Sequence, residues 1–321
     1  MNSINRSTIL LSLLAFSGHA LTAEPIQDPV DNAAESENIQ AHNPNQAISF
    51  EATIKATASD HANFDSDIGE FKRSHIEASI SASRRIGSSS MLSVEFGAGL
   101  LNYDIDPSAT SVAGDAADIG SEFDDITTLS LMGIFADRTD EGHSWFIGGG
   151  AISNSEQDAD FGDSVDGIIT GGFGYRVSNE LEIGLGVVAR TRLDDDALIV
   201  PFPQLKYSIN EFWSINSEGA GLRINYKASE AVDYGVYGKF QSTTFRLDDS
   251  HAFASEGMAT HRSFPLAFFA HYSPNDTIKL KGSVGAMIGG ELEILDTAGN
   301  DVASQDIDPG IFGTLSVSIS F

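Results

Sequence analysis

The feature that most constrains this chain is a strict alternation of apolar and polar residues that continues to its last residue. The final nine residues, "GTLSVSISF", place Leu315, Val317, Ile319 and Phe321 at every second position, with serine or threonine between them. Successive side chains of a β-strand point to opposite faces, so this segment predicts a strand with one apolar and one polar face. An open edge of this kind would template aggregation, which indicates that the strand is paired on both sides.

The same alternation begins near Ala47 and recurs along the chain. It is clear in "ISFEATIKATA", "HIEASISAS", "ELEIGLGVVART" and "TIKLKGSVGAMIGGELEI". No segment has the apolar period of 3.6 residues that marks an amphipathic helix. The sequence therefore predicts an all-β protein.

The predicted connections alternate between short turns and long, acidic loops, which is typical of a transmembrane barrel of the outer membrane. Counting strands gives about fourteen, or twelve if the segment Phe212–Lys227 does not form a hairpin. A β-sandwich is disfavoured because several of the predicted strands exceed ten residues. A β-helix is disfavoured because the sequence has no repeat. The predicted fold is a closed antiparallel transmembrane β-barrel over residues 47–321.

The first 46 residues differ from the rest. Residues 1–23 contain one charge, Arg6, then the apolar run "TILLSLLAF" and small residues, which predicts a signal peptide cleaved after Ala20 or Ala23. Residues 24–46 are rich in proline, asparagine and acidic residues, so we expect a disordered mature N-terminus. Together these features predict export to the bacterial outer membrane.

Charged residues within the predicted strands occupy the polar positions of the alternation. An Arg or Lys that faces lipid at mid-bilayer costs about 2–4 kcal/mol, so these side chains are expected to line a lumen. The predicted lumen-lining charges are Lys55, Arg190, Arg223, Lys227, Lys239, Lys279, Lys281, Glu182 and Glu291. The whole chain has 46 acidic and 18 basic residues, which argues against nucleic acid as a partner.

Two segments resemble known patterns. The terminal strand carrying Leu315, Val317, Ile319 and Phe321 resembles the signal that the barrel-assembly machinery of Gram-negative bacteria reads, which implies this machinery as a partner. Residues 198–249 resemble an uncharacterised family of Gram-negative outer-membrane barrels, through Pro201, Pro203, Gly221, "YK" at 226–227, Ser229 and "FRLDD" at 245–249. The second resemblance implies a location and a fold but no substrate.

The sequence contains only partial matches to the motifs of cofactor-binding, hydrolytic or metal-binding sites. "GLGVVA" at 184–189 matches a dinucleotide fingerprint but lies in an alternating segment with no following helix, so its glycines are interpreted as lumen-facing positions that relieve crowding. "GDSV" at 162–165 has no downstream histidine block, and the eight histidines show no metal-binding spacing. We therefore predict no catalytic residue, no metal site, no cofactor and no enzymatic activity.

The leading functional hypothesis is a passive, porin-like channel for small solutes. The alternative is a structural or surface-interaction barrel whose acidic loops, around 104–125 and 156–166, contact lipopolysaccharide or a partner. A barrel-embedded lipid hydrolase is a third hypothesis. Outer-membrane lipid is expected around any of them.

Overall fold

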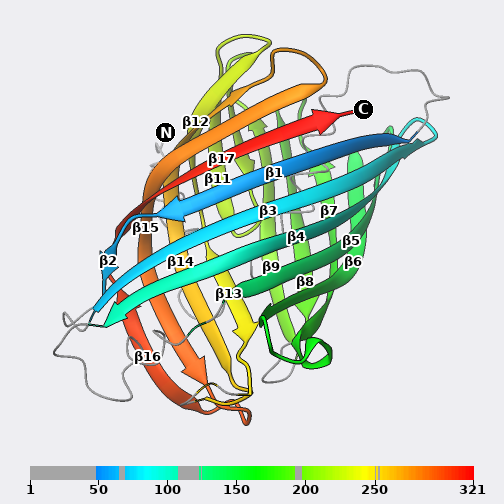
Figure 1. The fold of residues 1–321 in the computed structure, drawn as a ribbon. Coiled ribbons are helices and arrows are strands. Elements are labelled where there is room, and N and C mark those ends of the chain that lie inside the picture. Colours follow the sequence, from blue (N-terminus) through cyan, green and yellow to red (C-terminus); the bar gives the residue numbers. More distant parts are fainter. Residues whose placement is uncertain are drawn as a thin grey trace, which may run out of the picture.

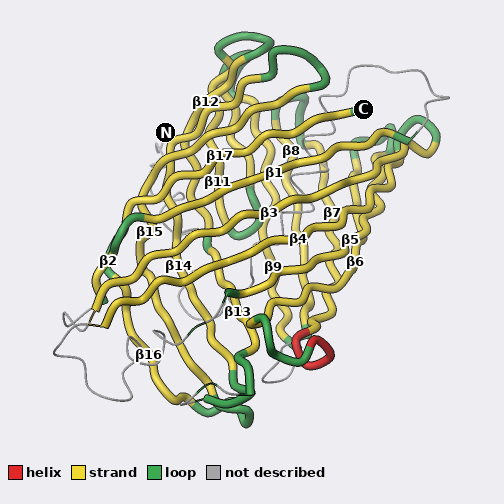
Figure 2. Tube along the Cα trace, viewed as in Figure 1, coloured by secondary structure: helices red, strands yellow, loops and turns green. Residues whose placement is uncertain are grey.

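The fold is one continuous antiparallel sheet that closes on itself (Figure 1). The computed structural model describes residues 48–64, 69–107, 123, 125–191, 197–249, 251 and 254–321. The predicted signal peptide and disordered segment, residues 1–46, lie outside the described residues. Nearly every described segment is strand, and one short 3₁₀ helix, η2 (Phe161–Ser164), precedes the seventh strand (Figure 2).

The strands follow one another around the wall in chain order. Their bounds are β1 Ser49–Ser59, β2 Ala62–Asn63, β3 Gly69–Ile86, β4 Ser90–Pro107, β5 Ile126–Arg138, β6 His143–Glu156, β7 Val165–Arg176, β8 Leu181–Arg190, β9 Leu198–Ser208, β10 Trp213–Ser217, β11 Gly221–Lys227, β12 Val232–Lys239, β13 Gln241–Arg246, β14 Met258–Tyr272, β15 Ile278–Leu295, β16 Asp301–Ile307 and β17 Gly310–Ser320. The segment Phe212–Lys227, the least certain hairpin in the sequence, forms β10 and β11.

The barrel has fourteen wall strands, because β1 with β2, β12 with β13, and β16 with β17 each form one interrupted strand. The sheet closes where β1 pairs with β17 on one edge and with β3 on the other. The main-chain N–H groups of Phe50 and Phe321 each donate to the carbonyl of the other residue at 2.9 Å. The last residue of the chain is therefore part of the wall, and the alternation that ends there has no free edge.

The outer surface of the wall is an apolar belt. Outward side chains such as Ile54, Ile169, Phe268 and Leu315 are 63–71% exposed, although large apolar residues are normally buried. All four residues of the C-terminal pattern lie in this belt, and the Phe321 ring stacks on Phe50 at 6.0 Å. Such a continuous apolar surface is stable only when lipid or detergent covers it.

The two ends of the barrel differ. Short turns and the C-terminus lie at one end, named here the inner end, and the longer connections lie at the other, named the outer end (Figure 1). No helix among the described residues is long and apolar enough to cross a membrane, a finding that does not bear on spanning by strands.

The outer end is filled by an apolar core. Its side chains come from strands on several sides of the barrel and from the connection between β13 and β14. Phe64, Ile126, Phe245, Leu292 and Ile294 are fully buried there, and the ring of Tyr103 stacks on Phe245 at 5.5 Å. The interior at this end is therefore packed like the core of a soluble protein.

The two faces of one strand provide a test of the barrel's orientation in lipid. Ile80 of β3 faces outward and is 47% exposed, whereas Ser81 faces inward between Glu51 and Glu95 of the neighbouring strands. We expect Ile80→Arg to lower the free energy of unfolding in lipid vesicles by about 2–4 kcal/mol. Ser81→Arg should cost far less, because the two carboxylates can pair with it. Equal losses from both changes, measured by denaturant titration, would contradict the assignment of the faces.

Candidate functional site

The charged wall of the lumen is formed by β1, β3, β11, β12, β15 and β17. Lys55 Nζ lies 3.1 Å from Glu77 Oε2, and Lys279 Nζ lies 3.0 Å from Glu51 Oε2. These side chains are 19–33% exposed, so both pairs are partly shielded from solvent. Lys55 is therefore held by a carboxylate on the adjacent strand β3, and Lys279 by a carboxylate on β1, on the far side of β17.

A second group of charges centres on Glu218, in the turn between β10 and β11. This residue is only 5% exposed. Its carboxylate accepts hydrogen bonds from Arg223 Nε at 2.7 Å and Arg223 Nη2 at 3.1 Å, and it lies 3.6 Å from Lys239 Nζ. The Arg223 guanidinium also lies 4.7 Å from the ring centre of Phe269, a cation–π distance. One buried carboxylate thus holds two of the predicted lumen cations.

The remaining predicted cations lie at different heights in the barrel. Arg190 Nε donates to Asp166 Oδ2 at 3.0 Å, and both residues are buried near the outer ends of β7 and β8. Lys227 pairs with Glu230 at 3.0 Å in an exposed turn of the inner end. Lys281 lies beside Ser316 and His271 in the register of β15.

Glu182 lies at the inner mouth of the lumen. It accepts hydrogen bonds from Arg138 Nη2 and Ser144 Oγ, each at 2.7 Å. Its neighbour across the sheet is Lys206 of β9, which the sequence analysis did not single out.

Glu291 differs from its predicted position in the lumen. The pairing of β14 with β15 shifts between Arg262 and Phe264, and Gly289 has φ 60° at the same level. Beyond this bulge the parity of β15 reverses, so that Leu292 and Ile294 enter the core and Glu291 faces outward. There Glu291 Oε2 accepts from Arg262 Nη1 at 3.0 Å. A bulge adds one residue to one strand, so the residues beyond it point to the opposite faces. An alternation that is simply extended along the sequence does not reveal this change.

The opposite wall, formed by β5 to β9, is graded from charged to apolar. Residues that lie opposite one another on these strands form rows across the wall. In order from the inner end toward the outer end, the rows on β8 and β9 read Glu182–Lys206, Gly184–Gln204, Gly186–Phe202 and Val188–Val200. The glycines of "GLGVVA" are the inward residues of β8, and a Cβ at Gly186 would occupy the space of the Phe202 ring.

A cavity of about 690 Å³ occupies the mouth of this graded wall. Its lining includes Arg138, Glu182, Lys206, Gln204 and Phe146. Phe146 lies on β6 in the same row as Phe202, separated by Gly172 and Gly186. Phe146 and the neighbouring Trp145 look alike in the sequence, and only the direction of their side chains on β6 distinguishes them, because Trp145 faces outward. Among the described residues, no group of three or more acidic or histidine side chains could hold a metal ion.

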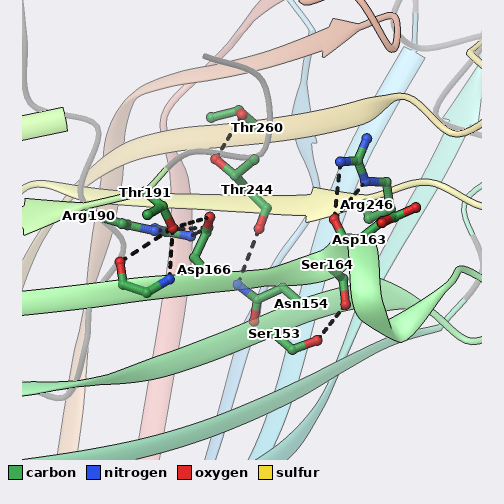
Figure 3. Close-up of polar contacts among 11 residues, drawn as sticks. Ser153, Asn154, Asp163, Ser164, Asp166, Arg190, Thr191, Thr244, Arg246 and Thr260 are labelled. Carbon is green, nitrogen blue, oxygen red and sulfur yellow. Dashed lines mark hydrogen bonds and ion pairs between the residues drawn. The ribbon is translucent and has the colours of Figure 1, made fainter. Parts of the chain in front are cut away.

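The wall has a seam between β6 and β13 (Figure 3). The two strands meet at a single parallel bridge, Arg246 with Ser155. Asn154 Nδ2 donates to the Thr244 carbonyl at 3.2 Å, and Arg246 Nη2 donates to the Asp163 carbonyl at 3.1 Å. Because β13 reaches β6 directly, it bypasses β7 to β11, and fewer strands surround the outer end than the inner end.

One edge of β9 is only partly paired. β10 pairs with β9 only at Lys206–Ser208, so within the described chain residues 198–204 have no strand partner on that side. The Leu205 N–H, which points to that side, donates to Ser217 Oγ at 3.0 Å. Pro201 and Pro203 share the parity of Leu205 and have no N–H to leave unpaired. The two prolines thus occupy positions where a missing donor has no cost.

Comparison with known proteins supports a resemblance in fold only. No known family matches the sequence, and no curated protein matches it. The resemblance of residues 198–249 to an uncharacterised family therefore stays a prediction.

Several solved structures resemble the barrel. An outer-membrane channel from Pseudomonas putida F1 has a TM-score of 0.49 at 9% identity, over 87% of this chain and 97% of that one. The P. putida toluene transporter TodX has a TM-score of 0.43 at 9% identity, over 86% and 90%. The translocator domain of the autotransporter NalP from Neisseria meningitidis has a TM-score of 0.37 at 9% identity, over 90% and 93%. All three TM-scores lie below 0.5 and all three identities are 9%, so nothing about the function or the solute of this chain follows from them.

The buried carboxylate provides a test of the charged wall. Glu218→Gln should leave Arg223 and Lys239 without their shared anion, and we expect the free energy of unfolding to fall by about 3–5 kcal/mol. Glu230→Gln is the matched control, because that carboxylate is exposed and its pair with Lys227 should contribute less than about 1 kcal/mol. Denaturant titration of both variants in detergent micelles measures the difference. Equal stability of Glu218→Gln and the unmodified protein would contradict the assigned role of Glu218.

Proposed function

We propose that this protein is an outer-membrane channel for small solutes. The observation that carries the proposal is a closed barrel with an apolar outer belt, a charged lumen and a cavity at the inner mouth. The belt favours a lipid environment, and the charges favour a hydrated interior. The surface-interaction alternative rests on two acidic loops. Most of 104–125 lies outside the described residues, whereas 156–166 is described and holds η2. Asp166 of that loop is engaged with Arg190 inside the barrel.

The apolar core imposes a condition on this channel. Because core side chains fill the outer end, a solute cannot follow the barrel axis to the outer surface in this conformation. Among the described strands, main-chain bonds are fewest at the seam between β6 and β13 and along the part of β9 that has no described strand partner. In the proposed mechanism, separation of β6 from β13 connects the lumen to the outside.

A cross-link across the seam tests this mechanism. The chain contains no cysteine, so the double variant Ser155→Cys with Arg246→Cys introduces one defined pair. We expect oxidation to lower the rate of solute uptake in a proteoliposome swelling assay, and reduction to restore it. The matched control is Thr53→Cys with Ser318→Cys, which links β1 to β17 within a continuous ladder and should not change the rate.

Two outcomes would count against the proposal. If the oxidised seam variant conducts as well as its reduced form, the seam is not the route. If the unmodified protein passes neither ions nor uncharged solutes in any reconstitution, the channel function itself fails.

A further inference from the structure

We propose that the inner mouth of the lumen binds a small aromatic carboxylate. The proposal rests on the channel function above, since it names the class of solute that such a channel would take. Its basis is the cavity of about 690 Å³, which lies within the range of about 300–1,000 Å³ common for small-molecule sites.

The apolar part of the site is the ring of Phe146. A Cβ at Gly172 would occupy the space of this ring, so glycine allows the ring to lie directly against the backbone of β7. Phe202 lies in the same way against Gly186, and the two rings terminate one row of the wall. Phe146 is only partly buried and lines the cavity, so part of its surface remains for a planar group to stack on.

The charged residues that line the cavity carry a net positive charge. Four basic residues line the cavity, Arg85, Arg138, Arg176 and Lys206, against three acidic ones, Asp137, Asp140 and Glu182. One cation and one carboxylate of this set pair with each other, since Glu182 accepts from Arg138, and three cations then stand against Asp137 and Asp140. Asp137 also accepts from Ser89 and Ser90. An added carboxylate is therefore favoured over an added cation.

The spacing of these groups sets the size of the ligand. Arg138 pairs with Ser144, two residues along β6 from Phe146, and Gln204 lies two residues along β9 from both Lys206 and Phe202. Two strand residues span about 7 Å, close to the length of a single ring bearing a carboxylate. A ring against Phe146 thus places its carboxylate among Arg138, Gln204 and Lys206, at the entrance.

Beyond the Phe146 row the wall offers no further space. Met132, Ile134, Ile168 and Val200 are 2–8% exposed, so the next rows are packed. This limit favours one ring over an extended chain.

The test uses the full-length barrel in detergent, titrated with benzoate and followed by saturation-transfer NMR. Acetate lacks the ring and benzyl alcohol lacks the charge, and we expect each to bind at least about tenfold more weakly than benzoate. If acetate binds as tightly as benzoate, the aromatic contact is refuted. If benzyl alcohol does, the requirement for an anion is refuted.

Variants locate the site. Phe146→Ala should weaken benzoate about three- to tenfold and leave acetate unchanged. The matched control is Phe173→Ala, because Phe173 lies on the adjacent strand but faces outward and is 53% exposed. Lys206→Gln should weaken benzoate by about tenfold or more. Heat-modifiable migration in gels shows whether each variant is folded. Equal effects of Phe146→Ala and Phe173→Ala in folded protein would overturn the assignment.

Binding and flux are separate readouts. A barrel that binds benzoate at this mouth but passes no solute retains the site and loses the channel function. A barrel that conducts but shows no benzoate binding retains the channel function and loses the proposed ligand.

Discussion

Everything in this structure depends on the requirement that main-chain N–H and C=O groups exposed to lipid be paired within the protein. An unpaired group in hydrocarbon costs several kcal/mol, so a sheet in a membrane must close. Here closure occurs between the first and last strands, and Phe50 and Phe321 complete the ladder with two main-chain bonds. The same requirement is consistent with Pro201 and Pro203, because on the part of β9 that has no described strand partner these two residues have no N–H to leave unpaired.

Once the sheet is closed, the alternation assigns every side chain to lipid or interior, and the interior is where this barrel departs from a simple pore. One wall holds paired charges, such as Lys55 with Glu77 and Arg223 with Glu218. The other changes from Lys206 through Gln204 to Phe202 over four residues of a single strand. Between the walls there is room at the inner end, whereas at the outer end apolar side chains meet across the barrel.

The sequence was sufficient to predict the fold class, the strand number and the outward face, because all three follow from a period of two and from the lengths of the connections. It was not sufficient for the interior. The β13 segment follows β12 directly and pairs with β14, yet its other side meets β6 at one bridge, and this long-range contact has no local signal. Glu291 fell on the other face because one bulge reversed the parity of β15. Glu218 was missed because a turn residue has no parity, although it carries the most buried ion pairs of the charged wall.

The packed outer end and the single-bridge contact between β6 and β13 have one cause, which is the position of β13. If β13 paired with β11 or β9 in a full ladder, the outer end would have the same wide circuit as the inner end, and core residues such as Phe245 could not reach Tyr103. By crossing to β6, β13 brings Phe245 into the core and leaves the edge of β9 without a partner. In the proposed channel, the core and the side-chain bonds of Asn154 and Arg246 hold the seam closed. Among the described strands, β6 and β13 are joined by a single bridge, whereas β13 with β14 and β5 with β6 are held by ladders of several pairs.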